Sequence, residues 1–210
     1  MTFEQRISAF NELGQFFNFI INNDSIKDAE LTEKFENWKE EAEYAVSDAE
    51  AYNNWFTKEN ITLALKSWAE ALTEENLLAW TKDYPFAETP KNVGIIMAGN
   101  LPLVGFHDLL SVVISGNNAL IKTSSKDDKL IKLAIKYLYS IDENFKLIIQ
   151  TVERLENYDA VIATGSNNTA KYLEYYFKNS LSIIRKNRTS VAVLKGDETD
   201  EQLQLLAEDI

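Results

Sequence analysis

Apolar residues in the first 85 positions recur at helical spacing. The first stripe, which predicts one amphipathic helix, consists of Phe3, Ile7, Phe10, Leu13 and Phe17. The polar run 22–25 is expected to end this helix, and a second apolar stripe follows within residues 30–50. Thr57 stands where a helix N-cap would be, directly before a further helical pattern, and residues 73–75 begin another short helix. We therefore expect residues 1–90 to form a helical region that packs on the next part of the chain.

The pattern changes after the loop between Pro85 and Pro90. Short apolar runs, each predicted to be a strand, occur at 93–98, 119–121, 147–149, 160–163 and 190–194. Helical patterns occur at 103–114, 129–140 and 167–178, and a last one begins at Asp200 and continues to the end. This alternation favours an α/β fold with a doubly wound parallel sheet, because strands that are apolar throughout are typical of a sheet covered on both faces. We expect residues 91–210 to form this region and the proline loop to be a junction inside one domain.

Polar turns follow three of the predicted strands. Gly99-Asn100 follows the first strand, residues 122–126 follow the second, and residues 164–167 follow the fourth. Ligands of doubly wound sheets bind at the carboxyl ends of the strands, so the chemistry is expected there. At Gly165-Ser166 two interpretations stay open: a phosphate-binding turn, or an ordinary turn in which Ser166 caps the next helix.

Composition restricts the function further. A net charge of −12 argues against nucleic-acid and anionic-membrane partners. No apolar run is long enough to span a bilayer, and the N-terminus does not resemble a signal peptide, so we expect a cytoplasmic protein. The many carboxylates of the helical region are interspersed with lysines, which indicates a solvated face and no metal site. The 210 residues contain no cysteine and no GxGxxG or P-loop motif, so neither a thiol nucleophile nor a common nucleotide fingerprint is present in them.

Three motifs occur in a recognisable order and spacing: Asn100-Leu101-Pro102, the run GNNALIKTS at 116–124, and Thr164-Gly165-Ser166. Together they resemble the aldehyde dehydrogenase superfamily. Residues 55–60, 98–108 and 184–194 are more closely similar to acyl-CoA reductases of the LuxC type, the fatty-acid reductases of bacterial luminescence and their relatives. This resemblance covers most of the chain. It implies an aldehyde-dehydrogenase-like Rossmann-type parallel sheet, preceded by N-terminal helices, and reduction of a fatty acyl thioester to an aldehyde.

The resemblance also implies roles for individual residues. Asn100 matches the catalytic asparagine whose side-chain amide donates to the oxyanion, although an asparagine that only closes a turn is the alternative. Lys122 matches the lysine that binds the adenosine ribose, the alternative being a lysine at a strand end with no ligand. Ser124 lies in the same turn, and Gly165 with Ser166 matches the turn that binds the pyrophosphate.

Two departures from the superfamily pattern sharpen these expectations. Many NAD-preferring members have a glutamate where this chain has Ser125, followed by Lys126. Loss of a carboxylate and gain of a cation favour the 2′-phosphate of NADP, so NADPH is the expected cofactor. No glutamate that could activate water occurs in 185–194, which favours thioester reduction over aldehyde oxidation. Arg185 and Arg188 are either phosphate contacts or structural ion-pair partners.

His107, the one histidine, is expected to be a packed helix residue more than an acid or base. The acyl-accepting cysteine of the family should follow the helix that begins near Asp200, so we expect a chain truncated before it. On this hypothesis the fragment binds cofactor but does not catalyse, and the substrate of the whole protein is an acyl-CoA or acyl-carrier thioester. Members of the superfamily commonly form homo-oligomers, which makes a homo-oligomer a candidate state. The alternatives are a non-catalytic nucleotide-binding or interaction module of the same fold, and a dinucleotide-fold enzyme that uses His107 and Asp108 without a thiol.

Overall fold

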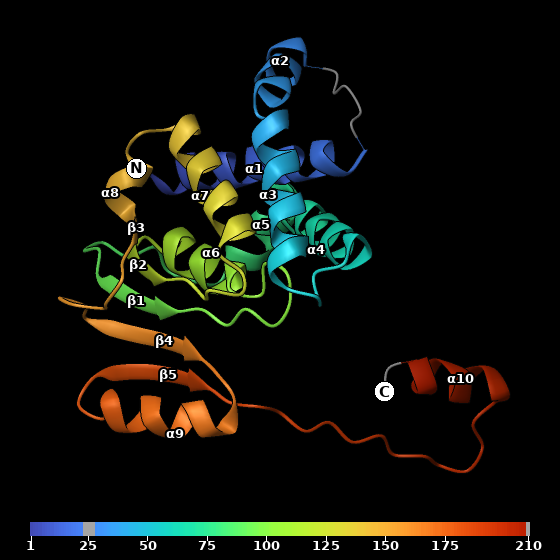
Figure 1. Ribbon diagram of the computed structural model, residues 1–210. Helices are drawn as coiled ribbons and strands as arrows, with labels where there is room; N and C mark the ends of the chain where they lie inside the picture. Colours follow the sequence, from blue (N-terminus) through green and yellow to red (C-terminus); the bar gives the residue numbers. More distant parts are fainter. Residues whose placement is uncertain (23–27, 209–210) are drawn as a thin grey trace.

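The computed structural model describes residues 1–22 and 28–208, and a parallel five-stranded sheet forms its centre (Figure 1). The strand order is β3-β2-β1-β4-β5, and every neighbouring pair is parallel. The strands are β1 (Asn92–Ile96), β2 (Asn118–Lys122), β3 (Ile149–Thr151), β4 (Ala160–Thr164) and β5 (Leu181–Arg185). After β1 the chain adds β2 and β3 on one side of β1, and then adds β4 and β5 on the other side. The direction of strand addition therefore reverses between β1 and β4. This reversal is the switch point at which doubly wound sheets bind their ligands.

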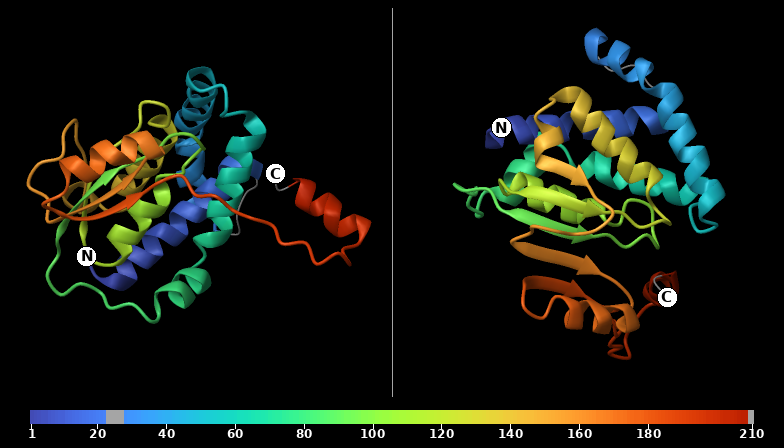
Figure 2. Two further views of the ribbon diagram at one scale, coloured as in Figure 1. Left: turned by 90° about the horizontal axis from the view of Figure 1, so that it is seen from below. Right: turned by 60° about the vertical axis from the view of Figure 1, so that its left-hand side comes forward.

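Helices cover both faces of the sheet. Helices α6 (Phe106–Ile114) and α7 (Lys129–Ile141) lie on one face, and α9 (Asn167–Tyr176) lies on the opposite face beside β4 and β5 (Figures 1 and 2). The short α8 (Phe145–Ile148) leads directly into β3. The expected doubly wound α/β fold is confirmed.

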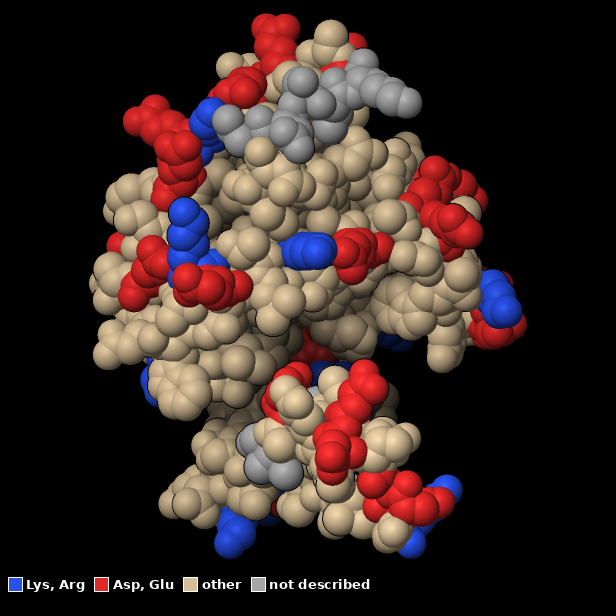
Figure 3. Space-filling model, turned by 90° about the vertical axis from the view of Figure 1, so that its right-hand side faces the viewer, with Lys and Arg blue, Asp and Glu red and all other residues tan. Residues whose placement is uncertain are grey.

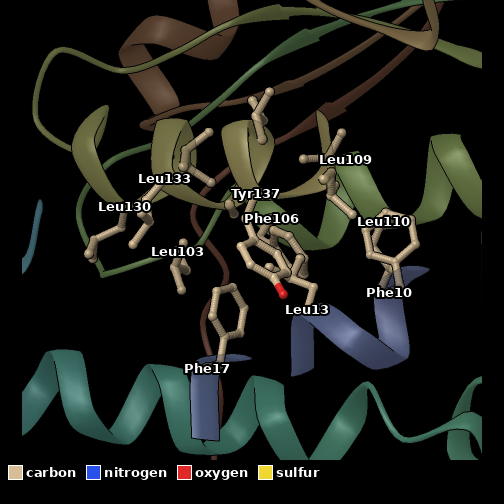
Figure 4. Close-up of a cluster of buried hydrophobic side chains, with 14 of the residues drawn as sticks. Phe10, Leu13, Phe17, Leu103, Phe106, Leu109, Leu110, Leu130, Leu133 and Tyr137 are labelled. Atoms are coloured by element: carbon tan, nitrogen blue, oxygen red, sulfur yellow. The ribbon is translucent and has the colours of Figure 1, made fainter. Parts of the chain in front are cut away.

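The N-terminal helices form a further layer over α6 and α7. They are α1 (Phe3–Asn22), α2 (Ala29–Asn37), α3 (Lys39–Tyr52), α4 (Lys58–Ala71) and α5 (Glu74–Thr81). Helix α1 supplies the aromatic centre of this layer, since Phe16 stacks on Tyr137 of α7 with ring centroids 4.1 Å apart. Phe10 of α1 meets Phe106 of α6 edge to face, and both lie in the cluster of Figure 4. Apolar residues of both regions therefore belong to one continuous core.

Arg6 of α1 connects the N-terminal layer to the end of α6. Its side chain is only 3% exposed, and its Nη1 donates to the carbonyl oxygens of Val113 at 2.5 Å and Asn117 at 3.1 Å. The guanidinium also lies over the ring of Phe86, 5.4 Å from its centroid, and burial lowers its pKa. A buried cation thus ties α1 to the last turn of α6 and to the loop that follows it, where its positive charge lies near the negative end of the helix dipole.

Several predicted helix boundaries agree with the structure. Thr57 and Thr73 are N-caps whose hydroxyl oxygens accept hydrogen bonds from the amides of Asn60 and Asn76. The apolar stripe in 30–50 is divided into α2 and α3 at Trp38. Helix α1 ends at Asn22, and the rest of the polar run expected to end it lies outside the described residues.

Other boundaries were wrong. The run 147–149 is not a strand along its whole length, because its first two residues belong to α8 and β3 begins at Ile149. The helix expected from residue 103 begins at Phe106, since Leu103 adopts the left-handed conformation with φ 57°.

The largest error concerns the last strand. The segment 190–194 is irregular, with Val191 and Val193 85% and 84% exposed, and β5 is formed instead by Leu181–Arg185. This earlier segment follows α9 after a short turn and takes the place beside β4. The last helix, α10 (Asp200–Glu208), has no buried residue and projects from the rest of the molecule (Figures 1 and 2).

Carboxylates are spread over the surface of the helical region, interrupted by lysines (Figure 3). In the described ranges, no group of three or more histidine, aspartate or glutamate residues is arranged to hold a metal ion. None of the helices in these ranges is long and apolar enough to cross a membrane.

Candidate functional site at the carboxyl edge of the sheet

The three polar turns lie at one edge of the sheet. In the register of the strands Ile96 is opposite both Lys122 and Ala163, so β2, β1 and β4 end side by side. The segment 97–105, which we call the Asn100 turn, therefore lies between the segment 122–128, the lysine turn, and the segment 164–166 that leads into α9.

The Asn100 turn and the lysine turn are in direct contact. A Cβ added at Gly99 would lie 2.6 Å from Cβ of Ser124 and 3.1 Å from the amide nitrogen of Asp127, so only glycine allows this approach. The side-chain amide of Asn53, at the C-terminus of α3, donates to the carbonyl oxygens of Gly99 at 3.3 Å and Lys126 at 3.4 Å. The N-terminal region thus helps to hold the two turns together.

Asn100 is exposed at this edge. Its side chain makes no hydrogen bond within the described ranges, so the amide is available to a ligand. The next residues turn back into the protein: Pro102 and Leu103 are buried, and Leu103 points into the core among side chains of α1, α6 and α7 (Figure 4). The turn therefore presents Asn100 outward from a buried anchor only three residues away.

Asp127 of the lysine turn stabilises the buried residue Leu103 through a hydrogen bond. Its Oδ2 accepts a hydrogen bond of 2.8 Å from the amide of Leu103, and its side chain is 3% exposed. Its Oδ1 is buried without a hydrogen-bond partner among the described residues. Burial raises the pKa of Asp127 to about 7, and the charge of Asp128 adds to this effect, although the hydrogen bond from Leu103 opposes both. Sequence reasoning missed Asp127, because nothing in the local pattern shows that the neighbouring turn covers it.

The lysine turn carries four of the expected cofactor residues. Lys122 is exposed and donates from Nζ to the carbonyl oxygen of Glu153 at 2.9 Å. Ser124 accepts from the amide of Lys126 at 3.2 Å, while Ser125 and Lys126 are exposed. Neither Lys122 nor Lys126 forms an ion pair with a residue that the structure describes, so both ammonium charges are open to an anion.

Gly165 and Ser166 lie at the start of α9. Ser166 caps this helix, since its Oγ accepts from the amide of Thr169 at 3.3 Å. This is the capping role that one of the two interpretations of the turn predicted. The amides of Asn167 and Asn168 belong to the first turn and have no intrahelical acceptor. A Cβ at Gly165 would lie 2.9 Å from the side chain of Thr169, so a larger residue would crowd this first turn.

A partly buried ion pair joins α6, which follows the Asn100 turn, to β5. Asp108, in the first turn of α6, is 2% exposed and accepts a hydrogen bond from Nη1 of Arg185 at the end of β5. Burial raises the pKa of Asp108, but the hydrogen bonds from His107 and Arg185 outweigh burial, so the net pKa is lowered. The carbonyl oxygen of Arg185 also accepts from the amide of Gly165 at 3.1 Å, which extends the connection to β4.

The structure thus gives Arg185 an ion-pair role, whereas Arg188 is exposed in the irregular segment after β5. The expectation that His107 is packed within the helices holds only in part. Its side chain is 53% exposed, with Nδ1 3.7 Å from Oδ1 of Asp108 and the ring 6.1 Å from that of Trp80.

A parallel sheet that reverses its order at β1 and β4, with polar turns at the adjoining carboxyl ends, defines the Rossmann-type class of α/β folds. A family model described as acyl-CoA reductase (LuxC) matches residues 17–210. The chain belongs to this LuxC family of acyl-CoA reductases, which confirms the resemblance found in the motifs.

Solved structures show the same fold at low sequence identity. The chain is similar to proline utilization A from Corynebacterium freiburgense, with a TM-score of 0.50, 12% identity, and coverage of 89% of this chain and 19% of that one. It is also similar to a mutant propionaldehyde dehydrogenase from the fucose utilisation bacterial microcompartment of Clostridium phytofermentans. For that protein the TM-score is 0.50, the identity 10%, and the coverage 89% of this chain and 43% of that one. The chain thus spans less than half the length of these two proteins, and no curated protein matches it.

Proposed function

We propose that this chain is the cofactor-binding portion of an acyl-CoA reductase, which reduces a fatty acyl thioester to an aldehyde with NADPH. The observation that carries the proposal is the meeting of three turns at the switch point of the sheet. They place the exposed side chain of Asn100 beside a turn that contains two lysines with no ion pair to any residue that the structure describes. Membership of the LuxC family supplies the reaction class.

Asn100 is the proposed catalytic residue. Its side-chain amide would donate a hydrogen bond to the thioester oxygen as negative charge develops there, an effect worth roughly 10²–10³ in rate. The position supports this role, because the side chain is exposed at the ligand-binding edge and is not used by another hydrogen bond within the described ranges.

The lysine turn and the start of α9 are the proposed cofactor site. Lys122, Ser124, Ser125 and Lys126 would hold the adenosine end, and Gly165 with Ser166 would face the pyrophosphate, where the free first-turn amides of α9 attract an anion. The residues fit NADPH, since the two lysines carry open charges and Ser125 stands where a carboxylate would repel a 2′-phosphate. When bound, NADPH supplies the hydride.

The acyl group must be held covalently by a thiol in this proposal, and the 210 residues contain no cysteine. We propose that the cysteine which forms the acyl intermediate lies beyond these residues in the whole protein. The substrate in this proposal is an acyl-CoA or acyl-carrier thioester, whose reacting carbonyl would lie at the Asn100 turn.

Calorimetric titration of the chain with NADPH and NADH tests the cofactor site. We expect NADPH to bind more tightly than NADH. Lys126→Ala should weaken NADPH binding about tenfold and leave NADH binding nearly unchanged, because it removes one charge near the 2′-phosphate. Lys146→Ala in α8 is the matched control, since Lys146 pairs with Glu143 away from this edge. A folded chain that binds neither nucleotide would refute the cofactor assignment.

A further inference from the structure

The Asn100 turn contains a residue in a costly backbone conformation. Leu103 has φ 57°, a region that side chains other than those of glycine, asparagine and aspartate rarely adopt. Its side chain is fully buried, which explains why glycine cannot replace it without loss of core packing. A contact from elsewhere in the protein must therefore stabilise the left-handed backbone of Leu103.

Asp127 supplies this restraint from the neighbouring turn. Its Oδ2 accepts from the amide of Leu103 at 2.8 Å, so Leu103 is fixed at its side chain by the core and at its amide by a carboxyl group. The second oxygen, Oδ1, is buried with no partner in the described ranges. A carboxyl group that leaves one oxygen unsatisfied in the interior costs stability, and such costs are concentrated at functional sites.

The restraint acts at short range on Asn100. Only Leu101 and Pro102 separate Asn100 from Leu103, and the proline fixes one of the intervening φ angles. On the other side of Asn100, Gly99 is pressed against Ser124 and its carbonyl oxygen accepts from Asn53. The backbone is therefore fixed on both sides of Asn100, at Gly99 and at Leu103, and Asp127 fixes Leu103.

We propose that Asp127 is a positioning residue, which holds Leu103 left-handed and thereby aims the amide of Asn100 at the reacting carbonyl. This inference rests on the proposed function of Asn100. It concerns the carboxyl group as an acceptor, and both its neutral and its charged form can accept from Leu103. Asp128 is the charged group that acts on Asp127 among the described residues, and it lies on the same side of the sheet at the start of α7.

Steady-state reduction of an acyl-CoA by the full-length protein, together with NADPH titration, tests the proposal. Asp127→Ala should lower kcat about 10–100-fold, with less than a threefold change in the KM for the thioester and in NADPH affinity. Asp127→Asn keeps an acceptor oxygen and should recover most of the rate. Glu143→Gln is the control, because Glu143 pairs with Lys146 on the surface, away from this edge of the sheet.

A double variant identifies the route of the effect. If Asp127 acts through Asn100, Asp127→Ala should add less than threefold to the loss already caused by Asn100→Ala. Independent, multiplying losses would overturn the proposal, as would a kcat for Asp127→Ala within threefold of the wild type.

The proposal stays testable if the proposed function fails. Hydrogen exchange at the amide of Leu103 should be at least tenfold faster in Asp127→Ala and near the wild-type rate in Asp127→Asn. If the wild type reduces no acyl thioester, the proposed function is lost and with it the catalytic role of Asp127, whereas the exchange rates still decide whether the restraint exists. Unchanged exchange in Asp127→Ala would overturn the inference even in an active enzyme.

Discussion

Two buried carboxyl groups flank the Asn100 turn, and their pKa values move in opposite directions. Asp108 meets Arg185, and the hydrogen bonds that it accepts keep its pKa low despite burial. Asp127 has only a backbone amide, so burial raises its pKa to about 7. The difference follows from the partners and not from the degree of burial, since the two side chains are almost equally inaccessible.

The raised pKa of Asp127 predicts a pH dependence of stability. The ordinary value is 3.8, so between about pH 4 and pH 7 the folded protein keeps a proton that the unfolded chain releases. The free energy of unfolding should therefore fall as the pH rises through this window, by up to about 1.4 kcal/mol for each pH unit, and level off above it.

Urea denaturation of the wild type and Asp127→Asn at about pH 5, 6, 7 and 8 measures this effect. The variant lacks the titrating group, so its stability should fall less steeply than that of the wild type across the window. Parallel pH profiles for the two proteins would contradict the assignment.

Gly99 makes a second prediction at the residue scale. A methyl group at this position would meet Cβ of Ser124 and the backbone of Asp127, so Gly99→Ala should destabilise the protein by about 1–3 kcal/mol. Adding Ser124→Gly removes the nearest of the opposing atoms and should restore part of the loss. Thermal denaturation of the single and double variants checks both statements, and additive losses would argue against the contact.

Sequence reasoning at this scale succeeds where function or local geometry depends on neighbours along the chain. The N-caps Thr57, Thr73 and Ser166 follow from local patterns, and Asn100 follows from its place after a strand. The role of Asp127 and the burial of Asp108 could not be found in this way. Their burial depends on which turns come together after folding, and an isolated acidic residue near a helix start is normally solvated.

At the scale of elements, the ion pair between Arg185 and Asp108 connects β5 to α6. Arg185→Ala would leave Asp108 buried without its main partner, and we expect a cost of about 1–3 kcal/mol, below that of a fully buried pair because Arg185 is partly exposed. The loss should be local, with faster hydrogen exchange in β5 and its partner β4.

Lys186→Ala is the control for this prediction. Lys186 also forms an ion pair, with Glu174 of α9 at 2.6 Å, but both groups are nearly half exposed. Its removal should change exchange in β5 little. Equal effects of the two substitutions would show that the buried pair has no special role.

The elements themselves were predictable to the extent that their apolar pattern was unambiguous. Strands β1, β2 and β4 were placed within two residues at either end, because each is a compact apolar run between polar turns. The choice of the last strand failed since residues 181–185 and 190–194 both fit a strand pattern. Only proximity to α9 and β4 decides between them, and this information is tertiary.

At the scale of the molecule, the helical region and the sheet share one core. Phe10, Phe16 and Phe17 of α1 pack on aromatic rings of α6 and α7. Residues 91–210 expressed alone would expose this surface, so we expect them to show no cooperative thermal transition. In contrast, removal of residues 195–210 should leave the transition of the rest unchanged, because α10 buries no residue. Circular dichroism and calorimetry of the two truncated chains give the comparison, and a cooperative fold of residues 91–210 would contradict it.

The fold class was within reach of the sequence at this scale, because alternating strand and helix patterns leave few arrangements other than a parallel sheet. The way in which the first helix inserts between α6, α7 and α4 was not. An amphipathic stripe shows that a helix has a buried face, but it does not identify the surface that covers this face.

The buried arginine of α1 has a consequence for how the protein is made. Arg6 is synthesised well before its two carbonyl partners, because Val113 and Asn117 lie 107 and 111 residues later in the chain. At a synthesis rate of about 5–20 residues per second, this interval is roughly 5–20 s. During this interval Arg6 has neither carbonyl partner, so the apolar face of α1 cannot be buried as it is in the native fold. The native core therefore forms only after α6 has been synthesised, and the apolar face of α1 is exposed on the nascent chain until then.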